Sequence, residues 1–388
     1  MQAGKKPERK SRIRGEMRIV IDATSLLLRS TGVKNYMYYW IRALQEQPLG
    51  ECIRLFPYFR RLSQLNHERS CAGKWATRSG RLLVNFCNIR GNRTLDLLEA
   101  RADVFHASQN LRNPPRWRPR LTATIYDMTC WILPETHTPA NVAATKRYGD
   151  QVLRRAAACT AISESARRDA IEILGLAEDR VETIYPGVAD EFFAATPEDA
   201  RAVARTYGLE RPYILFVGMI EPRKNIDRVL DVYSSLSQAV RSEYELVVAG
   251  ALGWCKPETV NRLLRPAAGI RYLGYVPESD LPGLTAGAAL FFYPALYEGF
   301  GLPVAQAMAC GVPAITSRGS ALEEIGGKDV VTVEPHRIEE MAAAVERLAL
   351  SPGLRSELGQ RGRRRAAQYT WARCAEQSLA FFRRAGGA

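Results

Sequence analysis

Tyr293-Pro-Ala-Leu-Tyr-Glu298-Gly-Phe-Gly-Leu-Pro303-Val-Ala-Gln-Ala-Met-Ala-Cys-Gly311 is the stretch of this chain that decides its fold. An apolar strand is expected to end at Tyr293, and a loop that carries Glu298 follows it. Pro303 suits the first turn of a helix and Gly311 suits the residue just past its last turn, so a short helix is expected between them. Such a strand-loop-helix unit directs free N–H groups and the positive end of a helix dipole toward one place. The unit therefore predicts a parallel α/β domain and a site for an anionic, hydroxyl-rich ligand beside a carboxylate.

A second strand-to-helix turn reads Phe216-Val-Gly-Met-Ile-Glu-Pro-Arg223-Lys224-Asn225 and follows the apolar strand 213–217. Elsewhere in a chain, an Arg-Lys pair is usually a solvated surface feature. At the carboxyl end of a buried strand the two cations are well placed to hold a diphosphate, because Arg223 offers a planar fork and Lys224 a point charge.

The length of 388 residues exceeds one ordinary hydrophobic core, so two domains of similar size are expected. Strand signals alternate with helical ones throughout, which is typical of parallel sheets with crossover helices. The stretch 197–212 precedes a new strand and is the predicted hinge. Residues 1–16 carry six Lys/Arg and almost nothing apolar, so we expect a disordered basic tail, and Met17 is an alternative start of the chain.

Positive charge is concentrated toward the two ends of the chain. Residues 1–150 hold 26 Lys/Arg and 12 Asp/Glu, a net charge of +14, whereas residues 151–350 hold 20 and 27, a net charge of −7. Residues 351–388 hold 8 and 2, a net charge of +6. A basic face beside aromatic residues would suit an anionic membrane surface or a lipid-diphosphate acceptor, and the alternative is a solvated, arginine-rich surface from a GC-rich genome. The residues of this basic aromatic run are Arg54, Phe56, Tyr58, Phe59, Arg60, Arg61 and Trp75.

Several classes of protein are excluded by what the sequence lacks. No stretch approaches about 18 apolar residues, so no membrane-spanning helix is expected. The eight cysteines form no Cys-x-x-Cys pair, which favours reduced thiols in the cytoplasm, and no signal peptide is evident. There is no Asp-x-Asp, no His-Glu-x-x-His, no phosphate loop and no nucleic-acid motif, and the four histidines are scattered. We therefore expect a protein without a metal site, a cofactor or a nucleic-acid partner.

The stretch from Glu298 to Gly311 resembles the signature of the retaining family 4 glycosyltransferases, also called glycosyl transferases group 1. Their pattern reads Glu-Gly-Phe-Gly-Leu-Pro, two residues, then Glu-Ala-Met-Ala and a glycine. The resemblance implies that Glu298 lies against the donor sugar and that the backbone of Phe300, Gly301 and Leu302 approaches the sugar and the diphosphate.

Gln306 stands where that family usually has a second glutamate, which grips the nucleotide ribose. A carboxylate accepts two charge-assisted hydrogen bonds from a pair of ribose hydroxyls, whereas glutamine offers one acceptor and one donor. The change is expected to cost about 1–2 kcal/mol of donor binding. By that arithmetic the donor affinity falls about tenfold.

Further matches extend the resemblance from about Met17 to the last helix. Lys224 falls on the position of the family's diphosphate-binding lysine, and Gly218 on the glycine before it, where Met219 replaces a common arginine. Gly32 falls in the glycine loop that opens the first helix facing the donor phosphates. The Glu-Pro-Arg-Lys-Asn form recurs in a branch that includes bacterial mannosyltransferases of surface-polysaccharide synthesis.

The strand 123–127 ends in Tyr126-Asp127, where the family usually has His-Asp facing the reaction centre. Tyr126 can donate a hydrogen bond to a phosphate or a sugar hydroxyl, but it cannot accept a proton near neutral pH. Asp127 is expected either to contact the sugar or the acceptor, or to serve as a turn or helix-cap carboxylate.

The resemblance implies a GT-B architecture, in which two doubly wound Rossmann-like domains face each other across a cleft. The acceptor side is expected over residues 17–200 and the nucleotide-sugar side over 208–369, with the last helix, about 370–388, rejoining the first domain. The implied activity is metal-independent, retaining transfer of a hexose, with mannose or a related deoxysugar favoured, from a nucleotide diphosphate sugar to a hydroxyl. GDP-mannose is the favoured donor, and UDP and dTDP sugars stay open.

The implied acceptor is a glycan or a lipid-linked glycan, and the implied setting is surface-polysaccharide synthesis in the cytoplasm, peripheral on the inner face of the membrane. Two alternatives stay open from the sequence. One is a sugar-nucleotide epimerase or hydrolase on the same architecture. The other is a non-catalytic scaffold of a polysaccharide assembly, which the changes at Met219, Tyr126 and Gln306 make worth weighing.

Overall fold

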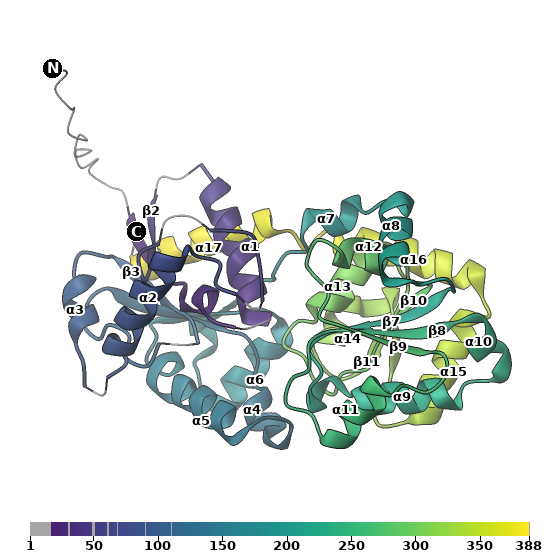
Figure 1. Cartoon of the computed structure of the whole chain (residues 1–388). Coiled ribbons are helices and arrows are strands. Elements are labelled where there is room, and N and C mark those ends of the chain that lie inside the picture. The colour runs from purple at the N-terminus through teal and green to yellow at the C-terminus, as the bar shows by residue number, and fades with distance from the viewer. Residues whose placement is uncertain are drawn as a thin grey trace.

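Two six-stranded parallel sheets stand side by side in the computed structural model, which describes residues 17–29, 32–48, 51–59, 62–67, 69–89, 91–109 and 111–387 (Figure 1). The first sheet has the strand order β2-β1-β3-β4-β5-β6 and the second has the order β12-β11-β10-β7-β8-β9. All strand pairs are parallel. The predicted tail, residues 1–16, lies outside the described residues.

The first sheet is built from the chain up to residue 183. Its strands are β1 (Met17–Asp22), β2 (Glu51–Phe56), β3 (Val104–Ala107), β4 (Arg120–Ile125), β5 (Ala158–Ala161) and β6 (Val181–Thr183). Its helices are α1 (Gly32–Glu46), α2 (Lys74–Cys87), α3 (Thr94–Leu98), α4 (Thr129–Ile132), α5 (Pro139–Tyr148) and α6 (Glu164–Leu174).

The second sheet begins at residue 213. Its strands are β7 (Tyr213–Val217), β8 (Glu245–Ala249), β9 (Ile270–Gly274), β10 (Leu290–Tyr293), β11 (Ala314–Ser317) and β12 (Val331–Val333). The helices of this half are α7 (Asp190–Ala194), α8 (Pro197–Tyr207), α9 (Ile226–Ser235), α10 (Gln238–Glu243), α11 (Pro257–Leu264), α12 (Leu281–Ala286), α13 (Leu302–Ala309), α14 (Ala321–Gly326), α15 (Ile338–Ala349) and α16 (Pro352–Ala366).

The central strands are continuous apolar runs because helices cover both faces of each sheet. Strand β10, Leu-Phe-Phe-Tyr, is fully buried, and its neighbour β7, Tyr-Ile-Leu-Phe-Val, is buried over its first four residues. Because the strands of each sheet are parallel, the loops that follow β7 and β10 meet at one edge. Both predicted ligand-binding turns therefore lie at the same edge of the second sheet.

The last helix, α17 (Trp371–Gly386), returns to the first half and packs against α1 (Figure 1). The indole N–H of Trp40 in α1 donates to Ser378 Oγ in α17 at 2.9 Å. Phe382 of α17 is fully buried among residues of the first half. The C-terminal helix thus completes the hydrophobic core of the N-terminal half.

The crossing between the halves differs from the predicted hinge at 197–212. Residues 197–207 form helix α8, which Thr196 caps through its hydroxyl and which packs against α12 of the second half. The chain passes between the halves before α7, where Val188 N donates to Tyr369 O at 2.9 Å. The segment 197–212 resembles a linker in sequence because it is polar and bounded by prolines. It is polar because helix α8 has no buried residue.

Two aromatics of the basic aromatic run are core residues. Phe56 is fully buried at the end of β2, and Phe59 is 5 % exposed. Tyr58 is partly exposed, and its hydroxyl donates to the buried carboxylate of Glu99. The strand alternation and the turn after β2 direct these rings inward, so the run does not form one exposed aromatic face, although Trp75 is 83 % exposed. Arg60 and Arg61 lie outside the described residues.

Candidate active site

The turn between β10 and α13 is shaped by a glycine. Gly301 has φ 94°, and a Cβ atom there would lie 2.4 Å from Leu322 Cδ2. Both observations require glycine, because other residues rarely adopt this backbone region and the space is already filled. Pro303 stands in the first turn of α13, as the sequence predicts. The loop from Pro294 to Gly301 is thereby held tightly over the end of the sheet.

The turn after β7 is bonded directly to that loop. Asn225 adopts φ 62°, and its amide Nδ2 donates to Pro294 O at 2.9 Å and to Pro335 O at 2.8 Å. Leu296 N donates to Arg223 O at 2.8 Å. The two turns that the sequence singled out therefore form one rigid unit.

Glu298 lies at the centre of a buried charged cluster. Its Oε1 accepts from Lys224 Nζ and, at 2.8 Å, from the hydroxyl of Tyr293, and it lies 3.0 Å from Arg223 Nη1. The carboxylate of Glu221 lies 2.6 Å from Arg223 Nη2. Two carboxylates and two cations thus balance one another at the carboxyl ends of β7 and β10.

The electrostatics of the cluster favour the charged forms of Glu298 and Arg223, whereas burial and then the neighbouring Arg223 lower the pKa of Lys224. Burial opposes ionisation of Glu298, but Arg223, Lys224 and the Tyr293 hydroxyl outweigh it and lower the pKa of Glu298 to about 2. Burial also opposes the charge on Arg223, and Glu298, Glu221 and Asp127 overcome it, so the pKa of Arg223 is raised. Glu298 is therefore a carboxylate over the whole physiological pH range.

Arg223 already uses much of its guanidinium inside the protein. Besides its contacts with Glu221 and Glu298, its Nη1 donates to Tyr297 O at 2.7 Å, and its buried Nε has no hydrogen-bond partner among the described residues. In this arrangement Arg223 holds the loop in place. Nζ of Lys224 also lies 5.3 Å from the ring centre of Tyr293. Because an ammonium group has three hydrogen-bond donors, Lys224 is better able than Arg223 to donate to a ligand.

The end of β4 contributes Tyr126 and Asp127 from the first half. A Cβ atom on Gly299 would lie 1.9 Å from Tyr126 O and 2.9 Å from Asp127 Cβ, so the two halves touch at this point. Ser163 Oγ, at the start of α6, donates to Gly299 O at 2.6 Å. The loop of the second half is therefore seated on the first half, and Asp127 lies close enough to Arg223 to affect its pKa.

Asp127 also closes a local turn. Its Oδ1 accepts from the backbone N of Thr129 at 2.9 Å and from the Thr129 hydroxyl at 2.5 Å. The turn carboxylate, one of its two predicted roles, is thus present in the structure. Tyr126 is 9 % exposed, its ring packs edge-on against Tyr36 at 5.5 Å, and burial raises the pKa of its hydroxyl.

The predicted donor-binding residues occupy different environments. Gly32 begins α1, and a Cβ atom there would meet nothing within 4 Å. Gly218 faces the Tyr293 ring, with a Cβ atom there 3.5 Å from that ring. Phe300 is 3 % exposed, and its ring packs against Tyr369 at 5.6 Å, so only its backbone is available to a ligand. Leu302 is half-buried and Gln306 is 9 % exposed, both in α13.

Sequence reasoning missed two residues of the site. The sequence predicts no role for Glu221 in the Arg-Lys turn, yet Glu221 is 4 % exposed and pairs with Arg223. His137 follows α4, and its Nε2 is buried without a hydrogen-bond partner among the described residues. Burial and then Arg223 lower the pKa of His137, so it is neutral near pH 7. A lone histidine in a loop carries no sequence signal that could have placed it here.

The described ranges contain no group of three or more His, Cys, Asp or Glu side chains arranged to hold a metal ion. Within the same ranges, no helix has the length and apolar character needed to cross a membrane.

Two protein families match the two halves of the chain. Residues 30–192 match the family described as Glycosyltransferase Family 4, and residues 203–365 match the family described as Glycosyl transferases group 1. The first match covers the first sheet except β1, and the second match covers β7 to β12. The charged cluster lies in the second match, and Tyr126 and Asp127 lie in the first.

Two curated relatives from Escherichia coli are mannosyltransferases by name. The chain is 28% identical over 377 residues to the O-antigen chain mannosyltransferase B, with 94% of this chain and 98% of the relative covered. It is 32% identical over 239 residues to the serotype-specific mannosyltransferase WbdA, with 59% of this chain and 29% of that longer relative covered.

Among solved structures, the sucrose-phosphate synthase from Thermosynechococcus elongatus superimposes with a TM-score of 0.70 at 17% identity, covering 95% of this chain and 98% of that one. At this identity the likeness concerns the fold, and it agrees with the two parallel sheets described above. With both family matches, the full-length mannosyltransferase relative and the two-sheet fold, the chain belongs to the GT-B glycosyltransferases of family 4, and it acts as a hexosyltransferase of surface-polysaccharide synthesis.

Proposed function

We propose that this chain transfers a hexose with retention of the anomeric configuration and without a metal ion. The observation that carries the proposal is the buried cluster of Glu298, Lys224 and Arg223 at the carboxyl ends of β7 and β10. Fixed cations in a site with little solvent stabilise charge on a departing diphosphate, which is the task that a metal performs in other transferases. Glu298 then faces the donor sugar as an ionised carboxylate.

The reaction breaks the bond between the anomeric carbon and the diphosphate oxygen. The acceptor hydroxyl attacks the anomeric carbon from the side that the leaving group vacates, and its proton passes to the departing phosphate oxygen. Lys224 stabilises the new charge on the diphosphate, while Arg223 keeps the Tyr297–Glu298 loop in position. The contact of Gly299 with Tyr126 closes the site to water, which would otherwise compete as acceptor.

GDP-mannose is the proposed donor. The names of both Escherichia coli relatives support mannose, as does the Glu221-Pro-Arg-Lys-Asn225 turn. Gln306 lies in the middle of α13, at the position that the family's ribose-binding carboxylate usually occupies. A neutral partner there predicts weaker nucleotide binding than a glutamate would give.

The proposed acceptor is a hydroxyl of a glycan or a lipid-linked glycan at the cytoplasmic face of the membrane. The name of the full-length relative, which refers to an O-antigen chain, supports a glycan acceptor. All eight cysteines are free thiols, as expected in a reducing compartment. A peripheral contact with an anionic membrane is part of the proposal.

The epimerase or hydrolase and the non-catalytic scaffold are less well supported. Both relatives are transferases by name, and a scaffold has no need of a carboxylate and two cations buried together, since burying charges is costly even when they are paired.

The proposal is tested by incubating the purified protein with GDP-mannose, a mannose-terminated acceptor and EDTA, and by reading the new linkage by NMR. We expect an α-linked mannoside, the configuration of the donor, and loss of transfer in the Glu298→Ala variant. A β-linked product, a requirement for added metal, or release of free mannose alone would each contradict it. Glu243→Ala, an exposed carboxylate of α10, is the matched control.

A further inference from the structure

His137 lies at the border between the halves, and the proposed reaction does not use it. Its ring nitrogen Nε2 is buried and has no hydrogen-bond partner within the part of the chain that the structure describes. A buried polar atom without a partner costs free energy, so such an atom in a native protein needs an explanation. A ligand that bonds to this nitrogen explains it, and the surroundings of the ring support a ligand.

The backbone on both sides of His137 is ordered. The preceding residues, Pro134–Thr136, form a tight turn, and His137 N donates to Pro134 O at 3.1 Å. The hydroxyl of the next residue, Thr138, accepts from Asn141 N at 3.2 Å and caps helix α5. The ring is therefore carried by a segment that the turn and the helix hold in place.

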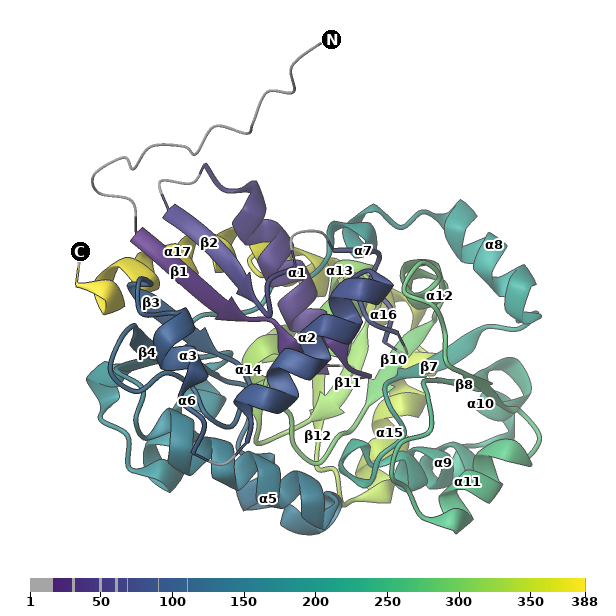
Figure 2. The ribbon, with the colours of Figure 1, turned by 60° about the vertical axis from the view of Figure 1, so that its left-hand side comes forward.

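The second half reaches this segment through Trp254. The indole N–H of Trp254 donates to Thr136 O at 2.8 Å, and the ring centre of Trp254 lies 6.1 Å from that of His137. Gly253 N donates to Ile220 O at 2.9 Å, which holds the tryptophan beside the turn that follows β7. Figures 1 and 2 both show α5, which follows His137, and α11, which follows Trp254, along the lower side of the molecule.

The ring of His137 also lies close enough to the charged cluster to be affected by it. Burial and then Arg223 lower the pKa of His137, so the ring is neutral near pH 7, and Asp127, Glu221 and Glu135 act in the opposite direction. A neutral imidazole has one nitrogen that donates and one that accepts. A hydroxyl both donates and accepts, so it can bond to Nε2 in either tautomer. The hydroxyls of a hexose are therefore suitable partners for this nitrogen.

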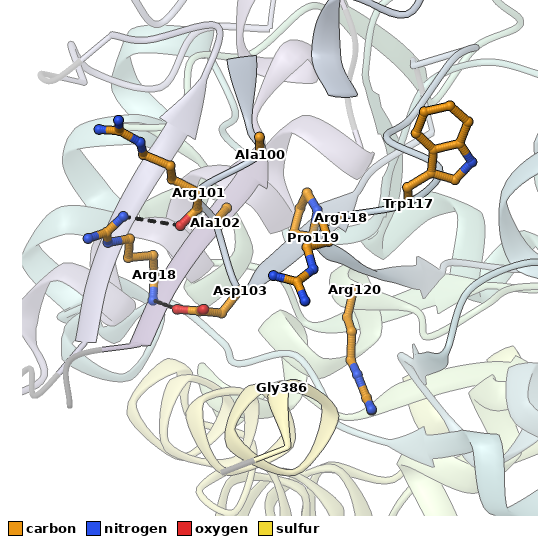
Figure 3. A pocket seen from close by; sticks show the side chains of 10 residues that line it. All are labelled: Arg18, Ala100, Arg101, Ala102, Asp103, Trp117, Arg118, Pro119, Arg120 and Gly386. Carbon is orange, nitrogen blue, oxygen red and sulfur yellow. Dashed lines mark hydrogen bonds between the residues drawn. The ribbon is translucent and has the colours of Figure 1, made fainter. Parts of the chain in front are cut away.

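The opposite edge of the first sheet has a different character. A hollow of about 830 Å³ lies there, and its lining includes Trp117, Arg18 near the start of β1 and Arg120 at the start of β4 (Figure 3). Asp127 and His137 follow the other end of β4. Because the strands are parallel, the hollow lies away from the charged cluster, and its residues provide controls.

We propose that Nε2 of His137 bonds to a hydroxyl of a hexose substrate that lies between the halves, with the ring of Trp254 beside it. A site with one placed polar group and an aromatic ring is typical of small-molecule binding. Tyr126 does not supply this bond, because its ring packs against Tyr36 inside the first half. The hydroxyl belongs to the donor hexose or to the acceptor glycan. The inference rests on the proposed function for the nature of the ligand, but binding requires no transfer.

The test compares His137→Phe with His137→Gln. Phenylalanine keeps a ring beside Trp254 but has no nitrogen, whereas glutamine keeps a polar group that can bond to a hydroxyl. Calorimetry measures the binding of GDP, of GDP-mannose, and of methyl α-mannoside in the presence of GDP. We expect one of the two sugars to bind His137→Phe about tenfold more weakly, because one hydrogen bond is lost, and His137→Gln to regain most of this affinity.

The sugar that loses affinity identifies the source of the hydroxyl, a loss for GDP-mannose pointing to the donor and a loss for the mannoside to the acceptor. GDP should bind the unmodified chain and both variants equally, because it lacks the hexose. Trp117→Ala is the control for the far edge of the sheet, where the ring is 81 % exposed, and it should bind both sugars as the unmodified chain does.

A purely structural role of His137 predicts the reverse pattern. If Nε2 bonded to no ligand, His137→Phe would remove an unpaired nitrogen and keep the ring, so sugar binding would not change. We expect the melting temperature of His137→Phe to be retained while sugar binding falls. Equal sugar binding by His137→Phe and the unmodified chain, a parallel fall in melting temperature, or no binding of either sugar beyond that of GDP would overturn the inference.

A transfer assay separates this inference from the proposed function. An unmodified chain that binds the sugars but transfers none contradicts the proposed function, and the role of His137 in binding is still measured. Transfer by the unmodified chain together with unchanged sugar binding in His137→Phe contradicts the inference alone.

Discussion

The two cations of the site have different roles. Arg223 holds the two turns together, and Lys224 can contact a ligand. Arg223 contacts Glu221, Glu298 and Tyr297 O, so its positive charge is neutralised within the two turns. Lys224 reaches the same carboxylate, but an ammonium has three donors and can turn toward a phosphate. The sequence predicts that the pair binds a diphosphate, and we propose that Lys224 has the larger share of that role.

Gln306 is the residue whose change should improve binding. In the Gln306→Glu variant we expect GDP to bind about tenfold more tightly, because a carboxylate accepts both ribose hydroxyls. Calorimetric titration of GDP measures this, and deoxy-GDP, which lacks one of the two hydroxyls, should gain less. Unchanged or weaker GDP binding in the variant would show that the ribose does not reach α13.

Gly299 should matter for transfer more than for nucleotide binding. A methyl group in Gly299→Ala would lie 1.9 Å from Tyr126 O, so the halves must move apart. A displacement of about 1 Å can cost about 100-fold in rate. We expect such a fall in the transfer rate, with GDP affinity unchanged because Lys224 belongs to the second half alone. Gly353→Ala, where a methyl group meets nothing within 4 Å, is the control, and full activity of Gly299→Ala would contradict the closed arrangement.

At the scale of elements, the strand-turn-helix units were predictable and the crossings between halves were not. The units after β7 and β10 carry local signals, such as Pro303 and Gly301 after a buried strand. Both units stand where the sequence predicts them. The segment 197–212 resembles a hinge because it is polar, yet residues 197–207 form helix α8, which packs against α12. The local helix signals, a capping box between Thr196 and Asp199 and Gly208 after the last turn, are in the sequence, whereas the packing partner is far away in the chain and is not reported by any local pattern.

The same limit applies to aromatic residues at the surface. Phe59 sits among arginines in the sequence but is buried, whereas Phe86 follows an apolar run but is 51 % exposed. His137 joins the site only because the two halves fold against each other, whereas Glu221 pairs with Arg223 two residues away in the same turn. The sequence therefore predicts which turns form the site, and the fold decides which neighbours complete it.

Helix α17 should be essential to the stability of the N-terminal half. Phe382 is fully buried against His106 at a ring distance of 5.2 Å. Phe382→Ala is expected to lower the free energy of unfolding by about 3–5 kcal/mol through lost burial and a cavity. Urea unfolding followed by circular dichroism measures it. The exposed Phe86→Ala should change stability by no more than about 0.5 kcal/mol, and equal effects of the two changes would refute the packing described.

For the whole molecule, one buried histidine predicts a loss of stability in weak acid. His106 is 1 % exposed, its ring nitrogens lie 3.0 Å and 2.7 Å from the hydroxyls of Thr122 and Thr124, and burial lowers its pKa to about 3. In the unfolded chain its pKa is about 6.5, so the unfolded state binds a proton first. The stabilising contribution is therefore complete above pH 6.5 and is lost as the pH falls toward 3.

Between pH 7.5 and pH 5 this group alone should lower the free energy of unfolding by about 2 kcal/mol. Comparing urea unfolding of the unmodified chain and His106→Asn at the two pH values isolates the term, since the other groups titrate in both proteins. The unmodified chain should lose more stability than the variant. An equal loss would mean that His106 is not buried in its neutral form.

The central claim is that Lys224 and the two bonded turns of the second half bind the diphosphate of a sugar nucleotide without a metal ion. The most direct measurement is calorimetric titration of GDP, UDP and dTDP into the purified chain and its Lys224→Ala variant, each with EDTA. We predict selective binding of GDP that EDTA leaves unchanged and that the variant weakens at least about tenfold, the loss of one charge-assisted contact. Binding that vanishes with EDTA, or that is equally strong in the variant, would contradict the claim.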